Sequence, residues 1–148
     1  MAEGKPVLYV IACGGRPAGD LPSFVQRLQA DGWTVCVIAT PSATKFVDAE
    51  RLGKLTGYPV RHDYKRPEEP DVLPAADAMA VVPATFNTTN KWAQGISDTL
   101  ALGLLNEALG LGLTAPSSRL SSKLLDPVSQ STPWLDTRIA STEGTPTR

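Results

Sequence analysis

The chain has 148 residues, of which 42% are hydrophobic and 20% are charged, as in an ordinary globular domain. Its formal net charge of -1 provides no basic surface for nucleic acid, so we expect no nucleic-acid partner. No apolar run reaches the roughly 18 residues of a membrane-spanning helix, and the first residues lack a signal-peptide pattern. We therefore expect a cytoplasmic protein with no membrane partner.

Three unbroken apolar runs predict buried strands, at residues 7–12, 35–39 and 78–82. Unbroken rather than alternating hydrophobicity is typical of parallel strands that are covered on both faces. The short segment 58–60 is a candidate for one more strand. Residues 63–70 are charged and contain two prolines, which predicts an exposed loop.

Apolar residues at helical spacing follow each of these strands. The pattern predicts a first helix that Asp20 caps and Gly32 ends, and helical pieces within residues 46–55 that stop at Gly57. Apolar residues spaced by four predict one long helix over residues 90–109.

This alternation of strands and helices predicts a flavodoxin-like or Rossmann-like α/β fold, a parallel sheet with helices on both faces. Ligands bind to such sheets beyond the carboxyl ends of the strands. Residues 14–19, 40–44 and 83–90 hold these positions, and all three segments are polar or rich in glycine. We expect these three strand-end segments to form the binding site.

The last third of the chain has a different composition. In residues 114–148, 17 of the 35 residues are Ser, Thr or Pro, and no run resembles a buried strand. Such a composition buries little apolar surface, which predicts a poorly ordered tail (114–148) behind a folded domain (1–113). A truncated or frame-shifted coding sequence is the alternative explanation.

Few side chains have the chemistry of a redox or metal centre. Cys13 and Cys36 lie in apolar runs, so we expect buried, reduced thiols. The alternative is a redox pair, which the two cysteines would form without the usual Cys-x-x-Cys spacing. One histidine and no carboxylate–histidine cluster give no indication of a metal site.

The first two strand-end segments have the features of a phosphate cup. Gly14, Gly15 and Arg16 lie between a strand and a helix, where backbone N–H groups and the helix N-terminus attract an anion. Thr40 and Ser42 offer hydroxyl groups at the neighbouring strand end. The alternatives are a tight strand-to-helix turn for the glycines and helix capping for Ser42.

The third segment carries the most chemistry. Asn87 has both donors and acceptors, which suit the edge of a planar heterocycle or a carboxylate. A glycine at position 95 within a helix lowers helix stability by about 1 kcal/mol relative to Ala, and contact with a ligand would compensate for that loss. Asp98 follows one turn later.

Residues 83–88, Pro-Ala-Thr-Phe-Asn-Thr, resemble the Pro-Ala-Ser-Ala-Asn-Thr motif of the homo-oligomeric flavin-containing cysteine decarboxylases. Gly95, Asp98 and Leu100 resemble the Gly-x-x-Asp-Asn-Leu that follows in that family. Residues 40–47 are similar to the family's second strand-to-helix junction. Together the resemblance covers about residues 6–113.

The resemblance implies an FMN cofactor, with its phosphate on the first two strand-end segments and its ring against the third. It also implies a homotrimer, or a multiple of one, with FMN between subunits. The cofactor-binding residues that we expect are Gly14, Gly15, Arg16, Thr40, Ser42, Pro83, Ala84, Thr85, Thr88, Gly95 and Asp98. The implied activity is oxidative decarboxylation of a cysteine-containing substrate, with Asn87 orienting its carboxylate.

Two departures from the family pattern affect the activity. Glu69 stands where the family has a catalytic histidine, and the only histidine, His62, lies seven residues earlier. We keep Glu69 as a candidate base and His62 as a candidate catalytic residue, with a solvated surface histidine as the alternative.

No cysteine follows Cys36, whereas phosphopantothenoylcysteine decarboxylases use a late cysteine. We therefore expect a small thiol or a peptide with a C-terminal cysteine as the substrate. A non-catalytic flavin-binding or regulatory subunit and a flavin prenyltransferase are the alternatives.

Overall fold

The computed structural model describes residues 4–111 and 138–140. Strands β1 (Val7–Ala12), β2 (Thr34–Ala39) and β3 (Ala78–Val81) form a parallel sheet in which β1 is central. A short strand, β4 (Arg138–Ala140), pairs antiparallel with β3 and gives the order β2-β1-β3-β4. The expectation of no strand after residue 113 was wrong at β4. The remainder of the predicted poorly ordered tail lies outside the described residues.

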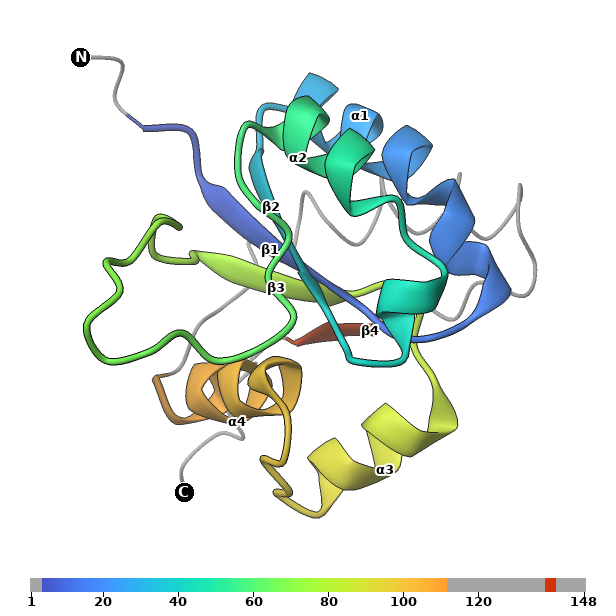
Figure 1. Ribbon diagram of the computed structural model, residues 1–148, viewed down its shortest axis with the longest axis vertical. Coiled ribbons are helices and arrows are strands. Elements are labelled where there is room, and N and C mark those ends of the chain that lie inside the picture. Colours follow the sequence, from blue (N-terminus) through green and yellow to red (C-terminus); the bar gives the residue numbers. More distant parts are fainter. Residues whose placement is uncertain (1–3, 112–137, 141–148) are drawn as a thin grey trace, which may run out of the picture.

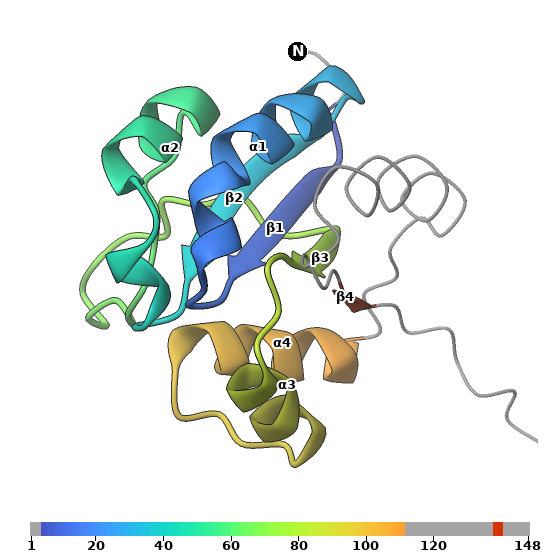
Figure 2. The ribbon, with the colours of Figure 1, turned by 90° about the vertical axis from the view of Figure 1, so that its right-hand side faces the viewer.

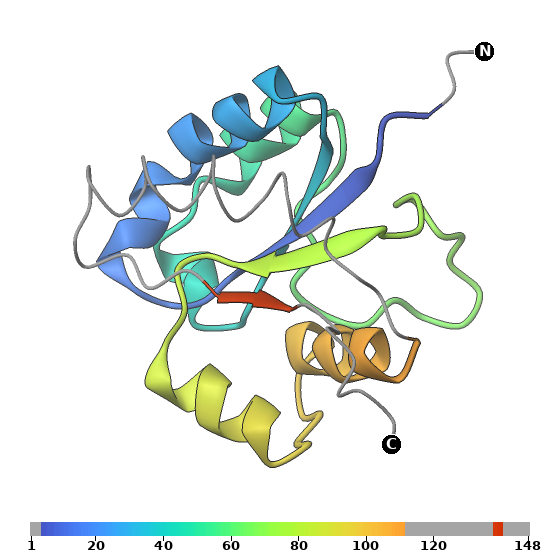
Figure 3. The ribbon, with the colours of Figure 1, turned by 180° about the vertical axis from the view of Figure 1, so that it is seen from behind.

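Helices cover both faces of this sheet, as Figures 1 and 2 show. Helices α1 (Leu21–Ala30) and α2 (Ala49–Thr56) pack on one face. Helices α3 (Phe86–Ala93) and α4 (Leu100–Leu111) lie on the other, and the view from behind shows the same layering (Figure 3). Within residues 4–111 and 138–140, every helix falls short of the length and hydropathy that a membrane crossing requires.

The central strand explains why its sequence is apolar without alternation. Leu8, Val10 and Ala12 belong to the core under α1 and α2. Tyr9 and Ile11 belong to the core under α4. Because both faces of β1 are covered, every residue of the strand is buried. The α/β sandwich predicted from the sequence is confirmed.

The predicted long helix over residues 90–109 was wrong. The structure has two helices separated by a turn in which Gly95 has a φ of 71°, a left-handed conformation that favours glycine. Thr85 caps the start of α3, and Thr99 Oγ1 accepts a hydrogen bond from the Leu102 N–H at 3.2 Å near the start of α4. Gly95 therefore ends one helix and does not lie inside one.

Two smaller expectations were also modified by the structure. The candidate strand at residues 58–60 is reduced to one bridge, in which Arg61 pairs with Ile38 of β2. Helix α1 begins directly after Asp20, as expected, but the Asp20 side chain makes no capping hydrogen bond. The loop over residues 63–70 is largely exposed and both cysteines are buried and unpaired, as predicted.

Candidate functional site

The three strand-end segments converge through their backbones. The Cys13 N–H donates to the Pro83 carbonyl oxygen at 3.1 Å, which joins the ends of β1 and β3. The Thr40 N–H donates to the Ala12 carbonyl oxygen at 2.9 Å, which joins the ends of β1 and β2. The edge predicted from the sequence therefore exists as one connected structure, which we call the strand-end junction (residues 13–16, 40–43 and 83–88).

Gly14 and Gly15 have different roles at the strand-end junction. A Cβ on Gly14 would lie 2.5 Å from the Ser42 Cβ and 2.9 Å from the Ser42 carbonyl carbon, so Gly14 allows the two segments to touch. A Cβ on Gly15 would have only the Pro17 Cδ nearby, at 3.6 Å. Gly14 is thus required for packing, whereas the space beside Gly15 is open to a ligand.

The surroundings of Gly15 fit an anion such as a phosphate. Arg16 is exposed and begins a 3-10 turn, η1 (Arg16–Asp20), that runs directly into α1. A guanidinium group next to an open glycine, at a point where a helix starts, provides both positive charge and room for close approach.

The two hydroxyl groups predicted for the phosphate cup differ in availability. Thr40 is buried, and its Oγ1 accepts a hydrogen bond from the Ala43 N–H at 3.2 Å. Ser42 is exposed and makes no capping hydrogen bond to the short turn η2 (Ala43–Lys45) that follows it. Thr40 therefore has the capping role that was the alternative for Ser42, and the Ser42 hydroxyl is the one available to a ligand.

A thiol and two hydroxyl groups lie together beneath the third segment. The Thr85 Oγ1 accepts a hydrogen bond from the Thr88 N–H at 3.4 Å and donates to the Thr88 Oγ1 at 3.2 Å. Burial raises the pKa of the neighbouring Cys13 thiol, and hydrogen bonds with Thr88 and Thr85 partly offset that shift. The Cys13 thiol is therefore protonated at neutral pH and packs as a small polar group.

Residues of the third segment change from buried to exposed along the chain. Pro83 is buried and Ala84 is half-buried, so these two residues continue the strand end. Phe86 and Asn87 form the first exposed positions of α3, and the Phe86 side chain is 88% exposed. Among the described residues the Asn87 side chain makes no hydrogen bond, so its amide is free to bind a ligand.

Gly95 and Asp98 lie in the connection between α3 and α4. Asp98 Oδ2 accepts from the Lys91 Nζ at 2.6 Å, an ion pair that links the end of α3 to this connection. No hydrogen bond in the described structure joins either residue to the strand-end junction. The argument from a glycine within a helix does not hold, and the contact of Gly95 and Asp98 with a cofactor stays a prediction from the motif.

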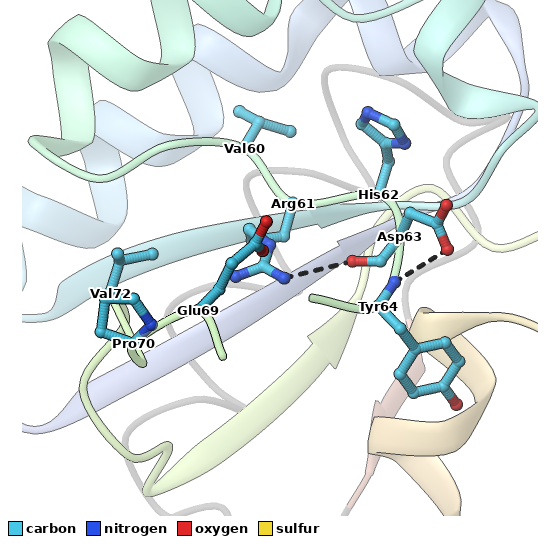
Figure 4. Close-up of a pocket in the computed structure, with 8 residues that line it drawn as sticks. All are labelled: Val60, Arg61, His62, Asp63, Tyr64, Glu69, Pro70 and Val72. Atoms are coloured by element: carbon cyan, nitrogen blue, oxygen red, sulfur yellow. Dashed lines mark hydrogen bonds between the residues drawn. The ribbon is translucent and has the colours of Figure 1, made fainter. Parts of the chain in front are cut away.

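The two candidate catalytic residues lie in a different place. His62 and Glu69 line a hollow of about 430 Å³ in the loop that leaves the β2 edge (Figure 4). We call it the edge hollow; its lining is Val60, Arg61, His62, Asp63, Tyr64, Glu69, Pro70 and Val72. These residues are outside the strand-end junction, but the hollow starts beside it, because the Ala39 N–H, next to Thr40, donates to the Arg61 carbonyl oxygen at 2.8 Å.

The chain matches known proteins over the region that holds the strand-end junction. Residues 2–114 match the family described as Flavoprotein. The chain is 32% identical over 103 residues to the Coenzyme A biosynthesis bifunctional protein CoaBC of Borreliella burgdorferi. That match covers 66% of this chain and 26% of CoaBC, so the chain spans about a quarter of that relative.

Two solved structures are also similar. The cypemycin decarboxylase CypD is 31% identical, with a TM-score of 0.58 over 70% of this chain and 63% of CypD. The FMN-dependent cysteine decarboxylase TvaF from thioviridamide biosynthesis is 22% identical, with a TM-score of 0.65 over 86% of this chain and 87% of TvaF. The likeness to TvaF confirms the flavodoxin-like fold, and the matches together confirm the superfamily that the motifs indicated.

Proposed function

This chain belongs to the flavoprotein family, and from that premise we propose that its strand-end junction binds FMN and that it decarboxylates a peptide with a C-terminal cysteine. The observation that carries the proposal is the open position beside Gly15, next to the exposed Arg16 and Ser42. An FMN phosphate needs positive charge, a hydroxyl group and close approach to backbone, and these three residues supply them.

The third segment provides the surface for the flavin ring. The half-buried Ala84 offers a small apolar surface after the buried Pro83, and Asn87 is the exposed amide that follows. In our proposal Asn87 hydrogen-bonds the carboxylate of the substrate, while Thr85 and Thr88 hold the first turn of α3 in place. Bound FMN would supply the two-electron acceptor that an oxidative decarboxylation requires.

We also propose that the functional unit is a homotrimer or a multiple of one, with a neighbouring copy covering the flavin. The 88% exposed Phe86 side chain beside Asn87 supports this, because the described residues leave a large apolar side chain uncovered at the strand-end junction.

A non-catalytic flavin-binding subunit is the second candidate. The presence of Glu69 where the resembling family has a histidine favours it, because a chain without that acid–base group would bind flavin without turnover. The two candidates differ in activity and agree on the cofactor.

The cofactor is tested by the flavin absorbance of the purified protein. We expect wild type to copurify with FMN and Gly15→Val to lose it, because a branched side chain fills the space beside Gly15 while its neighbours leave room for folding. Gly19→Ala is the matched control, since no atom lies within 4 Å of the added Cβ, and it should retain the flavin. A colourless wild type, or a yellow Gly15→Val variant, would contradict the proposal.

The reaction is tested with the FMN-loaded protein and a peptide that ends in cysteine. We expect loss of CO₂ by mass spectrometry, and a loss of turnover in Asn87→Ala with flavin retained. Flavin binding without product from any such peptide would select the non-catalytic subunit. Light scattering of the same preparation tests the trimer.

A further inference from the structure

A second hollow lies on the α4 side of the sheet, away from the strand-end junction. Its volume is about 400 Å³, within the range of small-molecule sites in proteins. We call it the α4 hollow; its lining combines an apolar floor with a charged rim. The floor is Tyr9, Ile38, Leu73, Leu100 and Leu104, and the rim includes Arg61, Lys65, Asp71 and Glu107.

The loop that roofs the α4 hollow is fixed at both ends. At its start Arg61 pairs through its backbone with β2, where the Ala39 N–H donates to the Arg61 carbonyl oxygen at 2.8 Å. At its end the Tyr9 hydroxyl donates to the Pro74 carbonyl oxygen at 2.5 Å. The Val7 N–H donates to Asp77 Oδ2 at 2.7 Å just beyond. The hollow is therefore part of the fold.

Gly103 in α4 allows the middle of the loop that covers the α4 hollow to lie close to the helix. The Tyr64 hydroxyl donates to the Thr99 carbonyl oxygen at 3.3 Å, close against the backbone of α4. A Cβ on Gly103 would collide with that hydroxyl, so the absence of a side chain there lets Tyr64 lie against the helix.

The charges on the rim are paired unequally. Lys65 and Asp71 form an ion pair with each other. Arg61 donates to a neutral partner, the Asp63 carbonyl oxygen, at 3.3 Å. Among the described residues neither Arg61 nor Glu107 has an ion-pair partner. Within residues 4–111 and 138–140, the rim thus presents one free cation, Arg61, and one free anion, Glu107, above an apolar floor.

From this arrangement we propose that the α4 hollow binds a small zwitterion with an apolar body, such as a short apolar peptide or a branched amino acid. The ligand carboxylate lies at Arg61, its ammonium at Glu107, and its apolar side chains on Leu100 and Leu104. This proposal does not rest on the flavin or on the decarboxylase activity.

The test is calorimetric titration of the full-length protein with four probes: leucyl-leucine, its N-acetyl form, its C-terminal amide and free leucine. We expect leucyl-leucine to bind and each blocked form to bind about tenfold more weakly, because a hydrogen-bonded charge is lost. Arg61→Gln should no longer distinguish leucyl-leucine from its amide. Glu107→Gln should no longer distinguish it from the N-acetyl form. Free leucine decides whether the ligand is an amino acid or a peptide.

Two further variants test whether the probe binds in the α4 hollow or elsewhere on the surface. Leu104→Trp fills the hollow and should abolish binding, while Arg51→Gln on α2, which packs on the opposite face, should bind as wild type does. No saturable binding, or equal binding of blocked and free forms, would overturn the proposal. Concentration-dependent self-association that the probes do not displace would instead assign the hollow to a second copy of the chain.

Discussion

The strand-end junction and the loop over residues 60–76 are two polar regions of the described structure, and different kinds of contact hold them together. Backbone contacts make the strand-end junction, in which Cys13, Gly14 and Thr40 touch the neighbouring segments. Side chains make the loop, in which Tyr64, Lys65 and their partners hold the roof of a hollow.

The two regions also differ in their chemistry: the loop has charged side chains, and the strand-end junction has backbone groups and small residues. The loop is rich in titratable side chains and lines both described hollows, yet the family motif lies at the strand-end junction. A phosphate or a flat ring is recognised largely by backbone and small residues, which leave little cavity in one chain. The presence of a hollow within one chain is therefore a poor guide to a site of this type.

The largest effect that we expect is from Gly14→Ala. The added Cβ would meet the backbone and Cβ of Ser42, and the two segments would be forced apart. We predict a loss of about 1–3 kcal/mol in the free energy of unfolding, measured by urea titration. Gly19→Ala, with open space around its Cβ, should change the value by less than about 0.5 kcal/mol. Equal effects would mean that the strand-end junction is not tightly packed.

Thr85→Ala should have the next largest effect, about 1 kcal/mol, because it removes the cap of α3. Asp48→Ala removes the cap of α2, where Oδ1 accepts from the Arg51 N–H at 3.0 Å, at a similar cost. Only Thr85→Ala is expected to reduce flavin binding as well. Loss of flavin in both variants would show that the effect follows stability and not the strand-end junction.

Gly103→Ala should change stability little, although it disturbs the loop. Alanine is favoured over glycine in a helix by about 1 kcal/mol, which offsets the lost Tyr64 hydrogen bond. Amide hydrogen exchange over residues 62–66 should become faster. Tyr64→Phe loses the same hydrogen bond without the collision, and it should speed exchange to a smaller extent.

The substitution with the smallest expected effect on the free energy of unfolding at neutral pH is at Cys36. Burial raises its pKa from 9.0 to about 11, so the folded state binds the proton more tightly than the unfolded chain does. Stability should therefore be unaffected by this group below pH 9 and should fall as the pH rises from 9 towards 11. Cys36→Ala should flatten that part of the pH profile in urea titrations. A profile unchanged by the substitution would contradict the assignment.

The sequence predicted the sheet and the convergence of its three strand ends well because both depend on local signals. Unbroken apolar runs located all three parallel strands, and the glycines of residues 14–15 marked the first strand-end segment. The break between α3 and α4 was missed because Trp92, Ile96 and Leu100 keep a spacing of four across it. Only the backbone conformation of Gly95 reveals the turn.

Other features were hidden because they depend on contacts between distant segments. Nothing in the sequence around Cys13 indicates that its thiol lies beside the hydroxyl groups of Thr85 and Thr88. Tyr64 lies against Gly103, which is 39 positions away in the chain. The sequence around Gly103 does not indicate that a tyrosine packs there. The proximity of Gly14 to Ser42 was inferable, because adjacent parallel strands end at the same edge.

The central position of β1 has a consequence for how the protein is made. Of the three parallel strands β1 leaves the ribosome before the other two, and its two neighbours are separated from it by very different lengths of chain. Pairing with β2 becomes available early, but the other edge of β1 stays bare until residues 77–81 emerge, since Val7 pairs with Asp77 across 70 positions. During that interval a nascent chain carries an uncovered apolar edge, which is the form most prone to aggregate or to need a chaperone.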